Sequence, residues 1–256
     1  MSVGEVDGLV ILVTGASRGI GRGVAHHLAR RGARLVVTGR RPDRLERLAG
    51  ELDRLGVDYL ARAVDVADRQ GMADTVAGAV ERFGRVDGLV ANAQTFRPVT
   101  PLEAVTPADL DVLFDTGPKG TLWSMQAVFA PMQAQGWGRI VTMGSNAGLT
   151  GAGGYGPYSA AKEAIRSLTR TAAREWGRHG ITVNCVCPVS AAHRLPPGDD
   201  PDRRAVFDAT YRDQPIARDG DAEHDIGPVV AFLLSDASRY LTGQTVMADG
   251  GALLRP

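Results

Sequence analysis

The sequence has few cysteines, few aromatic residues, no excess of charge of either sign and no long hydrophobic run. Its 256 residues include 29 basic and 29 acidic side chains, so nothing indicates a nucleic acid or an anionic membrane surface as a partner. No stretch approaches the roughly 18 apolar residues of a membrane span, and the N-terminus lacks the basic region of a signal peptide. We therefore expect a cytoplasmic protein with no membrane partner.

The two cysteines, Cys185 and Cys187, alternate on one apolar segment and are expected to point the same way. Such positions on one strand make a poor disulfide, so we predict buried, reduced thiols. We predict no metal site.

Short apolar runs alternate with helical patterns along the whole chain. The runs predict strands over Leu9–Val13, Arg34–Thr38, Tyr59–Val66, Gly88–Ala91, Arg139–Met143, Ile181–Val186 and Gln244–Ala248. Helices are predicted over Ile20–Arg31, Pro42–Leu55, Arg69–Phe83, Pro107–Gln135, Ser159–Arg178 and His224–Leu234. Apolar strands that alternate with helices indicate a parallel sheet covered on both faces.

We therefore predict a single α/β domain over residues 1–256, a doubly wound (Rossmann-type) parallel sheet of about seven strands. Residues 190–223 show no clear periodicity and are rich in Pro, Asp and Arg. A loop of that length in a compact domain is usually functional, so we expect a substrate lid there.

A glycine-rich turn follows the first predicted strand. The segment "ILVTGASRGIGRG" places Gly15, Gly19 and Gly21 between a strand and a helix. Glycines there allow backbone N–H groups to approach a pyrophosphate, which a helix N-terminus also attracts. The alternative is a glycine-rich turn with no ligand, which the strand–turn–helix context disfavours.

This turn and several later motifs resemble the classical short-chain dehydrogenase/reductase family. The segment "YSAAK" gives Tyr158-x-x-x-Lys162, and Ser145 lies thirteen residues before Tyr158. Asn92–Gln94 resembles a variant of the family's Asn-Asn-Ala-Gly. The resemblance covers nearly the whole chain and implies a nicotinamide dinucleotide and a small carbonyl or alcohol substrate. It also implies a homotetramer or dimer, built partly on the helices at 107–135 and 159–178.

The resemblance also implies the residues that contact the cofactor. They are Thr14, Gly15, Ser17, Arg18, Gly19, Ile20, Gly21, Arg40, Arg41, Asp65, Val66, Asn92, Ala93, Tyr158, Lys162, Pro188 and Val189. NAD-specific folds carry an acid after the second strand, whereas a basic residue there accommodates the 2′-phosphate of NADP. Gly39 stands in place of the acid and Arg40 and Arg41 follow it, which predicts NADP(H). The alternative is that these arginines are simply solvated.

Tyr158, Lys162 and Ser145 form the predicted catalytic group. Tyr158 and Lys162 are four residues apart on a predicted helix and share one face. A nearby ammonium favours the phenolate form of a tyrosine, which could then exchange a proton with a carbonyl or alcohol oxygen. Ser145 could hydrogen-bond the same oxygen. The alternative is a Tyr/Lys pair on a helix surface. The predicted substrate residues are Gln94, Phe96, Asn146, Leu149, Tyr155 and His193.

One departure from the family pattern falls at a catalytic position. The family's fourth catalytic residue is an Asn that lies 28 residues before the Ser, and that count leads to Gly117. The pair Gly117-Pro118 also interrupts the helical pattern, because proline breaks a helix. If a backbone carbonyl serves at this position, Gly117 could relay protons from Lys162 through a water. Otherwise the Asn was lost with the activity, and the chain is a non-redox relative such as a cyclase, a dehalogenase or a dinucleotide-sensing regulator. At Val189 a glycine is also replaced, and a β-branched residue there predicts an altered pocket floor.

Overall fold

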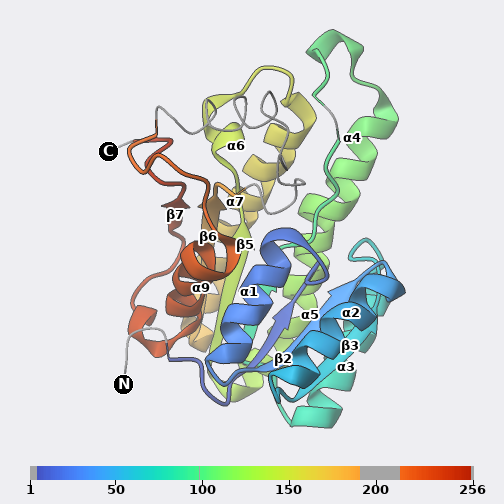
Figure 1. The fold of residues 1–256 in the computed structure, drawn as a ribbon, viewed down its shortest axis with the longest axis vertical. Helices are drawn as coiled ribbons and strands as arrows, with labels where there is room; N and C mark the ends of the chain where they lie inside the picture. Colours follow the sequence, from blue (N-terminus) through green and yellow to red (C-terminus); the bar gives the residue numbers. More distant parts are fainter. Residues whose placement is uncertain (1–4, 98, 191–213, 255–256) are drawn as a thin grey trace.

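Seven parallel strands form one sheet in the part of the chain that the computed structural model describes, residues 5–97, 99–190 and 214–254 (Figure 1). Their spatial order is β3-β2-β1-β4-β5-β6-β7. The strands are β1 (Val10–Val13), β2 (Arg34–Gly39), β3 (Tyr59–Ala63), β4 (Gly88–Ala91), β5 (Gly138–Met143), β6 (Ile181–Pro188) and β7 (Thr245–Ala248). The predicted doubly wound parallel sheet is confirmed.

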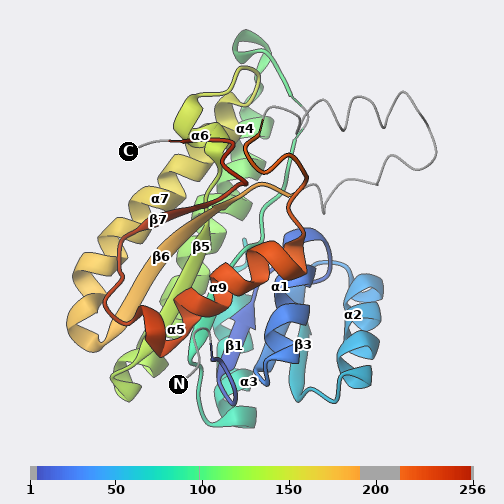
Figure 2. The same cartoon turned by 60° about the vertical axis from the view of Figure 1, so that its left-hand side comes forward.

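Helices cover both faces of this sheet (Figures 1 and 2). On one face lie α1 (Gly19–Arg30), α2 (Pro42–Arg54) and α9 (Gly227–Leu234), and on the other lie α3 (Arg69–Phe83), α5 (Gly120–Gln135) and α7 (Gly156–Trp176). Alternate strand residues separate into the two cores. Ile11 and Val13 pack in the core under α1, whereas Val10 and Leu12 pack in the core under α3 and α5. The continuous apolar runs are explained by this burial on both faces.

The helix predicted over 107–135 is divided into three consecutive pieces. These are α4 (Pro107–Phe114), the π-helix η2 (Asp115–Lys119) and α5. Pro118 lies inside the π segment and has no N–H to donate to the carbonyl of Phe114. The regular backbone hydrogen bonding of the α-helix is therefore interrupted there. The predicted break at Gly117-Pro118 is therefore confirmed.

Other element boundaries differ from the sequence-based expectation. The strand predicted to reach Val66 ends at Ala63, and the helix predicted from Ser159 already begins at Gly156. The short helix α6 (Asn146–Thr150) was not predicted, and a π segment, η4 (Ala222–Ile226), precedes α9. Three 3₁₀ turns complete the described elements: η1 (Leu102–Ala104), η3 (Gly177–His179) and η5 (Asp236–Ser238). Most of the predicted lid, residues 191–213, lies outside the described residues.

Two findings bear on the expectations from composition. Cys185 and Cys187 lie on β6 as buried free thiols, as predicted. None of the helices in the described ranges has the length and apolar character that a membrane crossing requires.

Candidate active site

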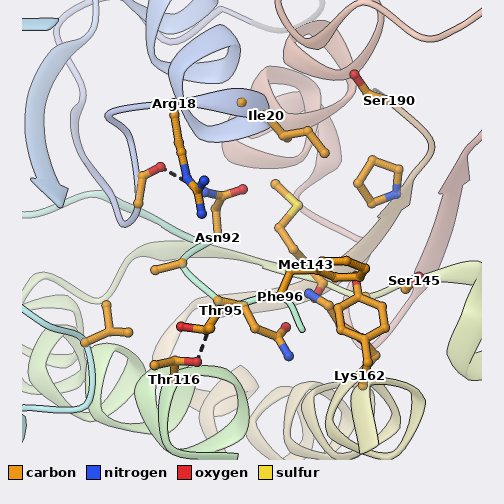
Figure 3. Close-up of a pocket in the computed structure, with 18 of the residues that line it drawn as sticks. Arg18, Ile20, Asn92, Thr95, Phe96, Thr116, Met143, Ser145, Lys162 and Ser190 are labelled. Carbon is orange, nitrogen blue, oxygen red and sulfur yellow. Dashed lines mark hydrogen bonds between the residues drawn. The ribbon is translucent and has the colours of Figure 1, made fainter. Parts of the chain in front are cut away.

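A cavity of about 1070 Å³ opens at the carboxyl ends of the central strands. The loops that follow β1 to β6 line it, together with the start of α7. The strand order reverses between β1 and β4, and open α/β sheets bind ligands at such a reversal. Figure 3 shows Arg18 and Asn92 towards one end of the cavity, and Ser145 and Lys162 towards the other.

The glycine turn packs directly on the loop that follows β4. Gly15 has a φ of 65°, and a Cβ on Gly21 would lie 2.4 Å from both Asn92 Nδ2 and the Gly15 carbonyl oxygen. Thr14 Oγ1 accepts hydrogen bonds from the backbone N–H groups of Asn92 and Ala93, at 3.0 and 3.1 Å. Asn92 Nδ2 in turn donates to the carbonyl of Thr14 at 2.9 Å. Thr14 and Gly21 do not line the cavity, so their contribution is to hold the turn in place.

The N-terminus of α1 faces this cavity. Arg18 is the N-cap residue, and its side chain makes no capping hydrogen bond. Ser17, Arg18, Gly19 and Ile20 all line the cavity. The N–H groups of the first turn therefore lack a side-chain cap, and the positive end of the helix dipole favours an anion at this point.

Arginines surround the same end of the cavity. Arg40 Nη1 lies 3.6 Å from Asp65 Oδ2, and Arg40 Nη2 donates to Thr95 Oγ1 at 3.3 Å. Arg41 donates to Asp43 at 2.9 Å, a bond that holds the pKa of that carboxyl below its usual value. Arg44 also lines the cavity and was missed in the sequence. Its place in the first turn of α2, next to the strand-end arginines, was the available signal.

The predicted catalytic side chains meet at the other end. Lys162 is 5% exposed, and its Nζ donates to the carbonyl of Met143 at 2.8 Å. The same Nζ lies 5.6 Å from the centre of the Tyr158 ring. Ser145 caps α6 by accepting a hydrogen bond from the Ala147 N–H at 3.2 Å. Ser145, Tyr158 and Lys162 all line the cavity, so the structure brings the three together as the spacing predicted.

Aromatic rings cover this catalytic end. Phe96 contacts the Tyr158 ring edge-on at 5.6 Å between centroids, and Tyr155 lies 6.3 Å from Tyr158. Phe96, Tyr155, Gln94 and Asn146 line the cavity, as predicted for substrate residues. Leu149 was predicted to line it and does not. His193 lies outside the described residues.

The loop after β4 is also joined to the π segment. Thr95 N–H donates to Thr116 Oγ1 at 3.0 Å (Figure 3). Thr116 Oγ1 in turn donates to the carbonyl of Val112 at 2.7 Å. Thr116 lines the cavity, whereas Gly117 is buried and does not line it. The Gly117 carbonyl accepts the Gly120 N–H, so one of its lone pairs is used within the helix.

The floor of the cavity includes Pro188 and Val189, as predicted. Within the described ranges no residue other than glycine has a positive φ, so Val189 adopts an ordinary backbone conformation. Its N–H donates to the carbonyl of Ala248 at 3.0 Å. Valine is therefore accommodated without backbone strain. Ser190 and Gln214, on either side of the undescribed segment, line the cavity as well. Both belong to the predicted lid at 190–223, although neither was singled out as a site residue.

Comparison with known proteins agrees with this architecture. A family model described as "Enoyl-(Acyl carrier protein) reductase" matches residues 15–252. The chain belongs to the short-chain dehydrogenase/reductase family. This membership supports oxidoreduction between alcohols and carbonyl compounds as the class of chemistry.

Relatives within the short-chain dehydrogenase/reductase family match over almost their whole length. A 12alpha-hydroxysteroid dehydrogenase from a Clostridium species is 37% identical over 261 residues, which cover 99% of this chain and 100% of the relative. Gluconate 5-dehydrogenase from Gluconobacter oxydans is 35% identical over 252 residues, covering 96% and 95%. The crystal structure of carveol dehydrogenase from Mycobacterium avium in complex with NAD superposes with a TM-score of 0.88 at 30% identity, covering 98% and 99%.

Proposed function

We propose that this protein is an NADP(H)-dependent oxidoreductase that interconverts a ketone or aldehyde and an alcohol by hydride transfer. The observation that carries the proposal is one cavity lined both by the glycine turn and by Ser145, Tyr158 and Lys162. A phosphate-binding turn and a proton-exchanging group at opposite ends of one cavity are what a dinucleotide-dependent redox reaction requires.

The residues of the cavity fit a dinucleotide. The uncapped N-terminus of α1 offers backbone N–H groups to a pyrophosphate. Gly15 and Gly21 keep the turn free of side chains, since a Cβ on Gly15 would lie 2.9 Å from Ala93 Cα. Asp65 and Val66 line the neighbouring wall, at the place where the adenine ring of the cofactor would bind.

The arginines support NADP(H) over NAD(H). Arg18, Arg40 and Arg44 line the cavity beyond the end of β2, and Gly39 ends that strand without a carboxylate. Guanidinium groups bind phosphate through charge-assisted hydrogen bonds. The relative carveol dehydrogenase was solved with NAD, so cofactor preference in this protein rests on its own arginines.

In this proposal the bound cofactor supplies or accepts the hydride, and the protein manages the proton. During reduction the Tyr158 hydroxyl gives its proton to the substrate oxygen, and during oxidation the Tyr158 phenolate takes the alcohol proton. Lys162, held against the Met143 carbonyl at 2.8 Å, places a positive charge beside the Tyr158 ring, with its Nζ 5.6 Å from the ring centre. Ser145 donates a hydrogen bond to the same substrate oxygen and fixes its position.

The substrate end combines aromatic and amide side chains. Phe96 and Tyr155 offer apolar faces next to Tyr158, while Gln94 and Asn146 offer hydrogen bonds. We expect a substrate with an apolar ring or chain next to its carbonyl group. Residues 190–223 are proposed as the lid over it.

The test is a change in nicotinamide absorbance when the purified protein and NADPH meet a panel of ketones and aldehydes, repeated with NADP⁺ and secondary alcohols. Turnover by wild type and its loss in Tyr158→Phe support the proposal. Tight NADPH binding without turnover of any compound would favour a non-redox role instead.

We also propose a homotetramer or dimer in solution. Half-buried aromatic side chains lie on the proposed interface helices, with Phe129 on α5 and Trp176 on α7 at 4.8 Å between ring centroids. Light scattering coupled to gel filtration gives the mass, and a monomer at micromolar concentration contradicts the proposal.

A further inference from the structure

In the described part of the chain, the side-chain amide of Gln94 is buried at the catalytic end of the cavity without a partner. Both Nε2 and Oε1 are inaccessible to solvent, and neither has a hydrogen-bond partner among the described residues. Gln94 lines the same cavity as Tyr158 and Lys162. Buried amides in proteins are almost always hydrogen-bonded, because leaving one unpaired costs free energy. A donor and an acceptor are therefore available for whatever enters this end of the cavity.

Gly117 provides the space that this amide occupies. A Cβ on Gly117 would lie 2.8 Å from Gln94 Nε2 and 3.1 Å from Gln94 Cδ. Gly117 does not have the positive φ that would demand glycine, since it lies within the π segment with helical neighbours. Glycine at 117 is thus explained by the Gln94 side chain and not by the backbone. Any larger residue at 117 would displace the amide.

Lys162 offers the complementary groups. Its ammonium is buried and carries three N–H donors. Among the described residues only the Met143 carbonyl accepts one of them. Lys162 and Gln94 both line this cavity. The two groups are not bonded to each other in this structure, so a hydrogen bond between them requires the Gln94 side chain to rotate, and that bond would satisfy both.

We propose that Gln94 is a positioning residue for the Tyr158–Lys162 pair, and that Gln94 and Gly117 act as one interdependent unit. The amide oxygen of Gln94 accepts a hydrogen bond from the Lys162 ammonium and so holds that ammonium beside the Tyr158 phenol. The Gln94 side chain extends from the loop after β4, and the π segment leaves room for it at Gly117. This inference rests on the proposed function, since it assigns a role within the same reaction.

The first arm of the test removes the polar atoms and keeps the volume. Gln94→Met should lower kcat for alcohol oxidation by about 10–100-fold, because a displaced catalytic group costs that much. It should also change the pH–rate curve, because the ammonium beside the reacting hydroxyl is held less firmly. Cofactor affinity and melting temperature should stay near wild type. A residue that only contacts substrate would change KM and leave the pH–rate curve in place.

The second arm tests the interdependence. Gly117→Asn in the presence of Gln94 should lower kcat, because the added Cβ would lie 2.8 Å from Gln94 Nε2 and displace the amide. The melting temperature should fall only modestly, since the Gln94 side chain can move, and both effects should be smaller in the Gln94→Gly background. The double variant should also regain part of the kcat lost in Gln94→Gly, because an amide returns from the opposite side of the contact. Strictly additive effects of the two substitutions on the melting temperature would show that the residues do not act together.

The control is Thr182→Val on β6. Thr182 Oγ1 is also buried and has no hydrogen-bond partner among the described residues, but Thr182 does not line the cavity. This variant should keep the wild-type kcat and pH–rate curve. If wild type is active and Gln94→Met matches it in kcat and pH dependence, the inference fails while the proposed function stands. If wild type reduces no carbonyl compound and oxidises no alcohol, both fall, and the melting temperatures still report whether residues 94 and 117 are coupled.

Discussion

Arg40→Ala should weaken NADPH binding by about 5–30-fold and leave NADH binding within about twofold of wild type. Arg40 is the residue directly after β2 and reaches over the cavity towards Asp65 and Thr95. The two cofactors differ only in the 2′-phosphate, so a residue that binds this group affects one cofactor and not the other. The selectivity of the effect is therefore the decisive quantity.

The magnitude follows from the contacts that Arg40 exchanges. A hydrogen bond to a charged phosphate contributes about 1.5–3 kcal/mol. Arg40 first gives up its ion pair with Asp65, which spans 3.6 Å between side chains that are 51% and 40% exposed. Exposed pairs of this kind contribute only about 0–1 kcal/mol. The net gain is about 1–2 kcal/mol, which corresponds to the expected fold-change in the dissociation constant.

Fluorescence or calorimetric titration of both cofactors at fixed ionic strength measures the effect. Arg47→Ala is the matched control, because Arg47 is 71% exposed on the neighbouring helix α2 and does not line the cavity. The reciprocal variant is Gly39→Asp, which should gain affinity for NADH; its Cβ would meet only Ser17 Oγ and Cβ, at 2.9 and 3.3 Å. Equal weakening of NADPH and NADH in Arg40→Ala would refute the assignment.

Three further variants examine separate parts of the structure. Tyr158→Phe should lower kcat by about 10²–10⁴-fold while NADPH affinity stays near wild type, because only the transferable proton is lost; a variant that keeps most of the rate contradicts this role. Gly21→Ala should destabilise the fold by about 1–3 kcal/mol in thermal unfolding, because its Cβ would lie 2.4 Å from Asn92 Nδ2; Gly177→Ala, where nothing lies within 4 Å, is the control. Glu51→Gln should lower the free energy of unfolding by about 0.2–1 kcal/mol at pH 7, and the difference should disappear in acid.

The sign of the Glu51 effect follows from its partners. Hydrogen bonds from Arg22, at 2.7 and 2.9 Å, hold the pKa of Glu51 below its ordinary value of 4.5. A carboxyl with a lowered pKa stabilises the fold above that ordinary value and loses the contribution as the pH falls through the folded-state pKa. Denaturant unfolding of wild type and variant at several pH values checks this. A difference that grows below pH 4 contradicts the sign.

The fold could be predicted because strands buried on both faces form continuous apolar runs. All seven predicted strands are present, and errors occur mainly at their ends. Val64–Val66 was included in β3 because it is apolar, but the strand ends at Ala63 and the next residues lead into the cavity wall. The short helix α6 was missed because its five residues, capped by Ser145, are too few for a helical periodicity.

The site was predictable where chemistry depends on spacing along the chain. The turn at Gly15–Gly21 and the pair Tyr158 and Lys162 each lie on one element, so their geometry follows from that element. Arg44 and Thr116 were missed because their approach to the cavity depends on how α2 and the π segment pack on neighbouring loops. Such contacts between distant segments leave no periodicity in the sequence.

The pair Gln94 and Gly117 shows why a single departure from a family pattern is hard to interpret from sequence. Considered alone, glycine in place of a catalytic amide favours loss of activity. The structure places the two side by side, with the Gln94 amide in the space that a Gly117 side chain would need. An amide is therefore still present beside the π segment, although it comes from the loop after β4. The departure at Gly117 consequently does not by itself argue for a non-redox protein, and the activity of Gln94→Met and of Gln94→Gly with Gly117→Asn separates the two interpretations.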